Sequence, residues 1–224
     1  MKILAAVAII VIGAWLWTGH TNAQNEHRLG AVANELAGRP VGVDCQGFWA
    51  AMLDIQSRSG EVDFPQGRAP DHMFLTHGVC GRLRRFMRSH SHRNLDCLST
   101  VDWSRFSFLA YYNAPCVRGA RDDAEAVNTL AHESMHLRGF MNEAQTQCYA
   151  IQEDAWAVVR LGGTEAQGDG VANLVLALQP GVGDDYQSSD CRAGGALDLN
   201  PGTPAFPSET PPAVPPVSLR GPAA

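Results

Sequence analysis

The sequence has almost no lysine: Lys2 is the only one among 17 basic residues, and the formal net charge of the 224-residue chain is −6. An acidic chain repels phosphate backbones, which argues against nucleic acid as a partner. The sequence also has no Cys-x-x-Cys pair, which argues against a structural zinc site built on thiolates. It contains no internal repeat, and its 45% hydrophobic content is enough for one buried core.

Long apolar runs are confined to the N-terminus. Lys2 precedes an apolar stretch at residues 3–17, and a polar stretch leads to a cleavage position after Ala23. This stretch is shorter than the roughly 18–20 residues of a spanning helix and is typical of a signal peptide. We predict that residues 1–23 are a signal peptide or an N-terminal membrane anchor formed by residues 3–17. Either alternative places the chain outside the cytoplasm, secreted or anchored at the outer face of the cytoplasmic membrane.

Cysteine usage agrees with export. Six cysteines follow the leader, an even number that suits three disulfides in an oxidising compartment. We expect a bond between Cys148 and Cys191, which would tie the C-terminal segment down, and a second between Cys80 and Cys97. The other two cysteines are Cys45 and Cys116.

The segment His132-Glu133-Ser134-Met135-His136 carries the strongest chemical signal. On a helix, side chains four residues apart lie one above the other, so both imidazoles can reach one metal ion. Glu133 points about a quarter turn away. It is therefore placed to touch water at the metal, as a general base does, and not to ligate the metal in line with the two rings.

The flanking residues indicate that this segment is helical. Asp122 followed by Glu125 resembles a capping box, so we expect the helix to start there, and Gly139 is a natural stop. Asn142 followed by Gln145 predicts the N-cap of a next helix, which ends at the glycines at 162–163.

Catalytic zinc usually has three protein ligands and one open position. Glu143, in the first turn of the second helix, is the predicted third ligand, provided that the chain reverses at Gly139. Asn142 is a poorer, neutral candidate. The histidines at 72, 77, 90 and 92 are alternative sources of a ligand, although each is more often a surface residue.

His132-Glu133-x-x-His136 followed by Glu143-Ala144 resembles the zincin metallopeptidases of the gluzincin type, over roughly residues 122–159. The resemblance implies that His132, His136 and Glu143 bind Zn²⁺ and that Glu133 is the general base. The connector between His136 and Glu143 is shorter than is common in that family. Residues 131–152 and 186–199 are also similar to uncharacterised exported proteins of high-GC Gram-positive bacteria, which implies an extracytoplasmic setting.

The expected fold is α+β and mainly α, a minimal zincin-like domain stapled by disulfides. It spans residues 24–200, and residues 201–224 form a disordered proline-rich tail. Helices are expected at 26–36, 46–57, 79–88 and 171–178, a loop at 60–70, and a strand at 106–112 that holds an extended substrate by analogy with zincins. Tyr186 is a structural residue or an oxyanion donor.

Two functions fit these observations. The first is an exported zinc metallopeptidase that hydrolyses peptide bonds in a peptide or protein substrate outside the cytoplasm. The alternative is an exported, disulfide-stabilised binding or scaffold protein with a structural or degenerate zinc site. The motif can also arise by chance on a polar helix face, in which case neither zinc hypothesis holds. The substrate and the oligomeric state are not encoded in these patterns.

Overall fold

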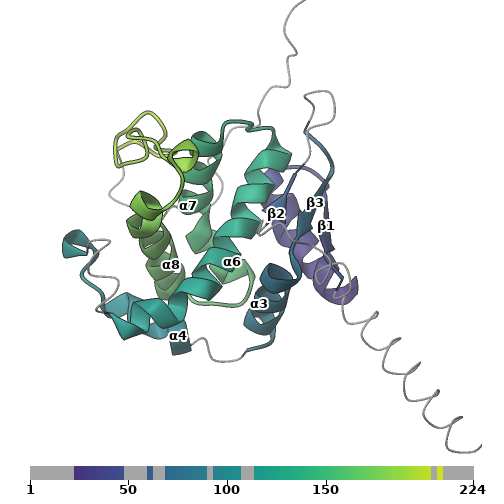
Figure 1. Ribbon diagram of the computed structural model, residues 1–224, viewed down its shortest axis with the longest axis horizontal. Coiled ribbons are helices and arrows are strands. Elements are labelled where there is room, and N and C mark those ends of the chain that lie inside the picture. The colour runs from purple at the N-terminus through teal and green to yellow at the C-terminus, as the bar shows by residue number, and fades with distance from the viewer. Residues whose placement is uncertain are drawn as a thin grey trace, which may run out of the picture.

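Three long helices, α6 (Pro115–Arg138), α7 (Glu143–Arg160) and α8 (Glu165–Leu178), form the larger part of the molecule (Figure 1). The computed structural model describes residues 23–47, 60–62, 69–89, 93–106, 114–202 and 206–208. Helix α7 packs against both α6 and α8. Around these three lie a helix at residues 23–37, α3 (His77–Arg88) and the short α4 (Arg93–Asp96). The described residues are thus mainly helical, as expected.

Local signals define the ends of the long helices. Pro115 stands in the first turn of α6, and Gly139 ends that helix with φ at 112°, a left-handed conformation that favours glycine. The Asn142 side chain accepts the backbone N–H of Gln145 at 2.9 Å and caps α7. Thr164 and Gln167 form a capping box at the start of α8. The predicted stop at Gly139 and cap at Asn142 are both confirmed.

A small sheet lies beside α6. The predicted α+β class implies a sheet, but none of the three strands of this one was predicted. Its strands are β1 (Gly42–Cys45), β2 (Gly60–Glu61) and β3 (His72–Leu75), in the order β1-β3-β2. β1 pairs with β3 in parallel, and β2 pairs with β3 antiparallel. β2 is therefore an edge strand, and it contacts α6. The sheet strands are too short for a clear alternating pattern, which explains why the sequence did not reveal them.

Three disulfides staple these elements together. Cys148 of α7 bonds to Cys191, as predicted. The prediction of a Cys80–Cys97 bond was wrong, because Cys45 bonds to Cys80 and Cys97 bonds to Cys116. The parallel pairing of β1 with β3 brings Cys45 to the start of α3, where Cys80 lies. Because the sequence did not reveal β1 and β3, it gave no reason to pair Cys80 with Cys45.

Other predicted boundaries also need correction. Helix α6 begins at Pro115 and not at Asp122, whose carboxylate instead pairs with Arg82 at 2.7 Å. The helices predicted at 26–36, 79–88 and 171–178 are present and extend further toward the N-terminus. The predicted loop at 60–70 begins instead with strand β2.

Several predictions fall outside the described residues. They are residues 1–22 of the leader expected at 1–23, nearly all of the helix expected at 46–57, all but Phe106 of the strand expected at 106–112 and most of the tail expected at 201–224. Within the part of the chain that the structure describes, no helix combines the length and the apolar character needed to cross a bilayer.

Candidate metal centre

The two histidines of α6 lie on one face of the helix, one turn apart. Their ring centroids are 4.7 Å apart, and the rings stand nearly perpendicular, at 82°. Both side chains are buried, with 9% of His132 and 6% of His136 exposed. The helix thus holds two imidazoles side by side at the base of a site, as their spacing predicted.

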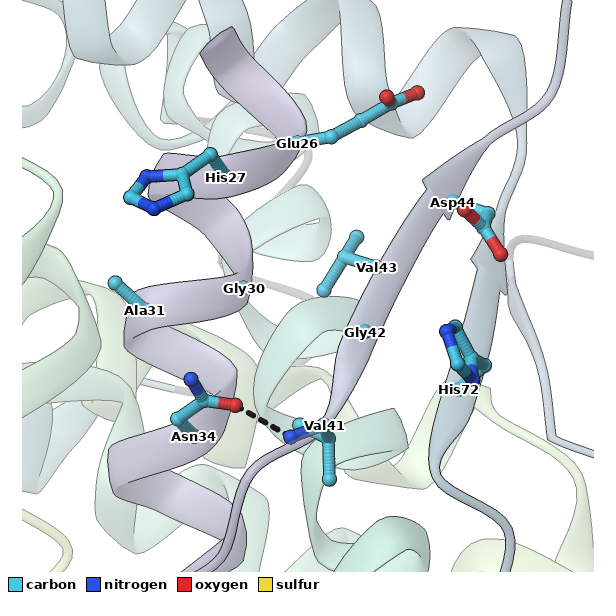
Figure 2. A pocket seen from close by; sticks show the side chains of 10 residues that line it. All are labelled: Glu26, His27, Gly30, Ala31, Asn34, Val41, Gly42, Val43, Asp44 and His72. Carbon is cyan, nitrogen blue, oxygen red and sulfur yellow. Dashed lines mark hydrogen bonds between the residues drawn. The ribbon is translucent and has the colours of Figure 1, made fainter. Parts of the chain in front are cut away.

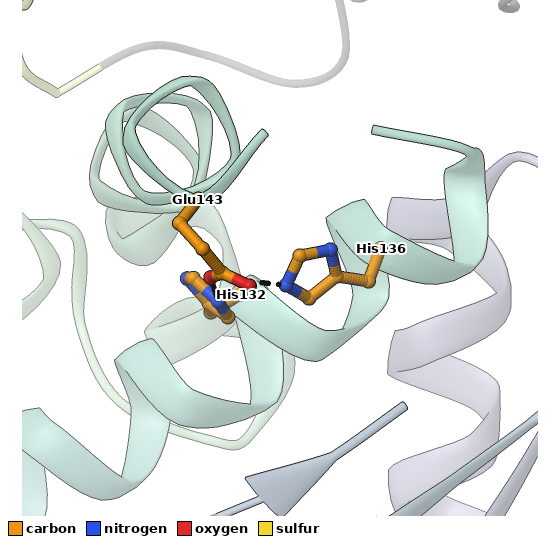
Figure 3. A group of neighbouring side chains, drawn as sticks. All are labelled: His132, His136 and Glu143. Atoms are coloured by element: carbon orange, nitrogen blue, oxygen red, sulfur yellow. Dashed lines mark hydrogen bonds and ion pairs between the residues drawn. The ribbon is translucent and has the colours of Figure 1, made fainter. Parts of the chain in front are cut away.

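Glu143 completes the group from the first turn of α7. Its Oε2 lies 3.1 Å from His132 Nε2 and 3.3 Å from His136 Nε2, and Figure 3 shows both rings directed at this carboxylate. The reversal at Gly139 makes this approach feasible, because a straight continuation of α6 would carry Glu143 on the order of 16 Å along the axis from His132. The predicted set of His132, His136 and Glu143 is therefore brought together in space.

The other ring nitrogen of each histidine has an acceptor. His132 Nδ1 lies 2.9 Å from Gln147 Oε1, and His136 Nδ1 lies 2.7 Å from the carbonyl oxygen of Phe140. The Phe140 carbonyl only accepts, so His136 Nδ1–H donates to it, and Nε2 is the nitrogen that faces Glu143 and can bind a metal. The turn at Gly139 therefore serves both ligands, since it also directs the Phe140 carbonyl back onto His136.

The electrostatics of the group favour the protonation states that ligate a cation. Burial lowers the pKa of His136 below 6.5, and the nearby His132 adds to this effect. The hydrogen bond with His132 lowers the pKa of Glu143 below 4.5, against the opposing effect of its partial burial. A neutral imidazole and an ionised carboxylate are the forms in which these side chains bind metals.

The donor set fits zinc. Zinc bonds to nitrogen and oxygen at about 2.0–2.1 Å in a tetrahedron, so neighbouring ligand atoms stand about 3.3 Å apart. The two N···O separations of 3.1 and 3.3 Å match this edge. Glu143 keeps 38% of its side chain exposed, so the group opens to solvent on the carboxylate side. Oxygen and imidazole donors with one open side are typical of catalytic zinc.

The side chain of Glu133 extends from α6 toward the edge strand β2. Its side chain is buried and packs against Gly60 of β2, so closely that a methyl group at Gly60 would stand 2.7 Å from Glu133 Oε1. The contact requires a residue without a side chain at position 60. This partner of the predicted general base was not identified from the sequence, because nothing near Gly60 marks it as part of a site.

Tyr186 lies beside His132, at the margin of the candidate metal centre. It belongs to the short 3₁₀ helix η5 (Asp184–Tyr186), and its ring centroid lies 5.7 Å from that of His132. The Cys148–Cys191 bond holds the following segment on α7, together with Gln152, whose side chain contacts the backbone of Leu197 and Leu199. The expected Cys148–Cys191 bond thus ties down the segment that follows Tyr186, and Tyr186 itself lies beside His132.

Of the histidines considered as alternative ligands, the two that the structure describes, His72 and His77, do not join the group. His72 lies on β3 at a hollow of about 320 Å³ between β1 and the helix at residues 23–37 (Figure 2). Its Nδ1 contacts Asp71 at 2.8 Å. His77 starts α3, and His90 and His92 fall outside the described residues. Among the described residues, His132, His136 and Glu143 form the one group arranged to hold a metal ion.

Comparisons with known proteins add no assignment. No family model, curated protein or solved structure matches this chain. The interpretation of the site therefore depends on its own geometry.

Proposed function

We propose that this chain is an exported, zinc-dependent metallopeptidase that hydrolyses peptide bonds with Glu133 as general base. The observation that carries the proposal is the convergence of His132 Nε2, His136 Nε2 and Glu143 Oε2, with both Nδ1 atoms bonded to acceptors. Zinc held there supplies a Lewis acid that polarises the scissile carbonyl and lowers the pKa of water to about 7.

The protein residues have distinct tasks in this proposal. His132 and His136 provide a buried, neutral nitrogen pair, and Glu143 adds the negative charge at the mouth of the site. Glu133 follows His132 on α6 and takes the proton of the attacking water, then passes it to the leaving amine. Its packing against Gly60 fixes the carboxyl group near β2, an edge strand in the order β1-β3-β2, along which an extended peptide would pair.

The cysteine pairing supports catalysis over a structural zinc site. Structural sites usually close the tetrahedron with four protein ligands, most often thiolates. All six cysteines are engaged in disulfides, so none is available as a thiolate. The three ligands and the solvent-facing Glu143 leave one position for water or substrate. The same disulfides support an oxidising, extracytoplasmic location.

The test is Glu133→Gln in the purified protein, assayed for zinc content and for cleavage of a broad peptide library with and without chelator. We expect zinc to remain and cleavage to fall by roughly 10²- to 10⁴-fold, the usual contribution of a general base. Glu125→Gln is the matched control, because Glu125 lies on the same helix, is half exposed and pairs with Arg121. Zinc without cleavage in the wild-type protein would favour a scaffold role, and undiminished cleavage by Glu133→Gln would refute the role of Glu133.

A further inference from the structure

A chain of four buried polar side chains leads from His132 into the space between α6 and α7. His132 Nδ1 contacts Gln147 Oε1 at 2.9 Å, and Gln147 Nε2 donates to Asn128 Oδ1 at 2.9 Å. Asn128 Nδ2 then donates to Asp154 Oδ2 at 3.1 Å. All four residues are at most 8% exposed, so water does not compete freely for these bonds.

The chain has a direction, and its inner end sets that direction. An amide can turn over and exchange its donor for its acceptor, whereas a carboxylate oxygen only accepts. Asp154 Oδ2 therefore requires the NH₂ group of Asn128, which leaves Asn128 Oδ1 to face Gln147. Gln147 must then present its own NH₂ group to Asn128 and its Oε1 to His132. An oxygen at this position accepts a hydrogen bond, so Nδ1 of His132 carries a proton.

We propose that Asp154 is a positioning residue that, through Asn128 and Gln147, keeps the proton of His132 on Nδ1 and leaves Nε2 for the metal. This inference rests on the proposed zinc site and assigns a residue that the sequence did not mark. His136 needs no such chain, since its Nδ1 donates to the Phe140 carbonyl, which cannot exchange its acceptor for a donor.

The surroundings of Asp154 agree with this role. Its side chain is fully buried, and Oδ1 has no hydrogen-bond partner among the described residues, so Asn128 is the contact that satisfies this carboxyl group. Burial raises the pKa of Asp154 well above 3.8, against the effect of the bond from Asn128. An ionised carboxyl group at this position is costly unless it is paired, and the N–H of Asn128 stabilises the ionised form that fixes the direction of the chain.

The first test moves the carboxylate from one end of the chain to the other. Asp154→Asn removes the fixed acceptor, and we expect zinc affinity to fall on the order of 10-fold, the lower end for outer-shell partners. In the Gln147→Glu background a carboxylate contacts His132 directly, so there Asp154→Asn should leave the affinity unchanged. The double variant keeps the net charge and restores a chain that is satisfied in the reverse direction. Ser134→Ala, which removes a buried hydrogen bond to Leu130 on the same helix, is the control with unchanged affinity.

The second test does not depend on zinc binding or on activity. ¹⁵N NMR of the metal-free protein at pH 7 should show a proton on His132 Nδ1, and Asp154→Asn should produce a population with an unprotonated Nδ1. This measurement on the wild-type protein judges the inference even if Asp154→Asn fails to fold. It also separates the inference from the proposed function, whose failure appears as absent zinc binding or absent cleavage.

Two results would overturn the inference. One is a wild-type, metal-free His132 whose Nδ1 carries no proton. The other is that Asp154→Asn lowers zinc affinity by the same factor in the wild-type background and in the Gln147→Glu background. Asp154 would then act only on folding.

Discussion

In the part of the chain that the structure describes, histidines and carboxylates come together in two places, and in one of them they are arranged so that they could hold a metal ion. Where the C-terminal part of α6 meets the first turn of α7, the side chains of His132, His136 and Glu143 bring nitrogen and oxygen atoms within 4.8 Å of one another. At the hollow beside β1, His27 and His72 lie near Glu26 and Asp44 (Figure 2). There Glu26 accepts the backbone N–H of Cys45, and His72 pairs with the adjacent Asp71.

The difference lies in burial and in outer partners. His72 has 54% of its side chain exposed, compared with 9% for His132. Each α6 histidine has one nitrogen fixed by an acceptor and the other directed at Glu143. Composition alone therefore does not define a metal site, and the outer partners that orient the rings decide it.

The largest expected effect is the loss of a ligand. Glu143→Ala should weaken zinc binding by more than the roughly 10- to 100-fold typical of outer-shell partners, because it removes both a donor and the charge between the two rings. His72→Ala, at the hollow, should leave zinc affinity unchanged. Competition with a chromophoric chelator measures both variants. Equal affinities would show that the metal does not bind at α6.

Next in size is the effect of crowding Glu133. Gly60→Ala places a methyl group 2.7 Å from Glu133 Oε1, so the carboxyl group must move. We expect turnover to fall on the order of 100-fold, as for a misplacement of about 1 Å, with zinc affinity retained.

Gly78→Ala on α3 is the matched control for crowding, since nothing lies within 4 Å of its added methyl group. Turnover that is the same in Gly60→Ala and in the wild-type protein would contradict the role of β2 in holding Glu133.

The disulfides near the two places should differ in their effect on turnover. Removal of the Cys148–Cys191 bond or of the Cys45–Cys80 bond, by substitution of both cysteines with serine, should lower the free energy of unfolding by about 2–4 kcal/mol. Loss of Cys148–Cys191 should also reduce turnover, because it releases the segment that follows Tyr186 beside His132. Loss of Cys45–Cys80, near the hollow, should leave turnover of the folded protein unchanged. Denaturant unfolding and cleavage assays distinguish these outcomes.

The smallest effect concerns pH. Burial lowers the pKa of His136 below the 6.5 of a free imidazole, so the unfolded chain binds more protons than the folded one in this range. The metal-free protein should therefore lose stability as pH falls below 6.5 and through the lower pKa of the folded state. His136→Asn should flatten this part of the unfolding profile, and the exposed His72→Asn is the control. An unchanged profile in His136→Asn would argue against its burial as a neutral ring.

The approach of His132, His136 and Glu143 could be predicted from local sequence, because it depends on short-range features. The spacing of His132 and His136 fixes one helix face, Gly139 supplies the reversal, and Asn142 caps the next helix immediately before Glu143. These features depend only on neighbouring residues and on helix geometry.

The remaining parts of the site depend on contacts between segments far apart in the sequence. Gly60 meets Glu133 only because β2 is added to the edge of β3. Asn128 and Asp154 are ordinary polar residues until α6 and α7 pack and bury both. The start of α6 was misplaced because Asp122 and Glu125 resemble a cap, whereas each forms an ion pair with arginine. Local patterns do not contain this information.

The most direct test of the metal centre is zinc X-ray absorption spectroscopy on the purified, zinc-loaded protein. On the proposed function we expect one zinc per chain with two imidazole nitrogens and oxygen donors at about 2.0–2.1 Å, and a loss of one imidazole in His132→Ala. Sulfur in the coordination shell, or a spectrum that is the same in His132→Ala, would contradict the assignment of this group as the zinc site.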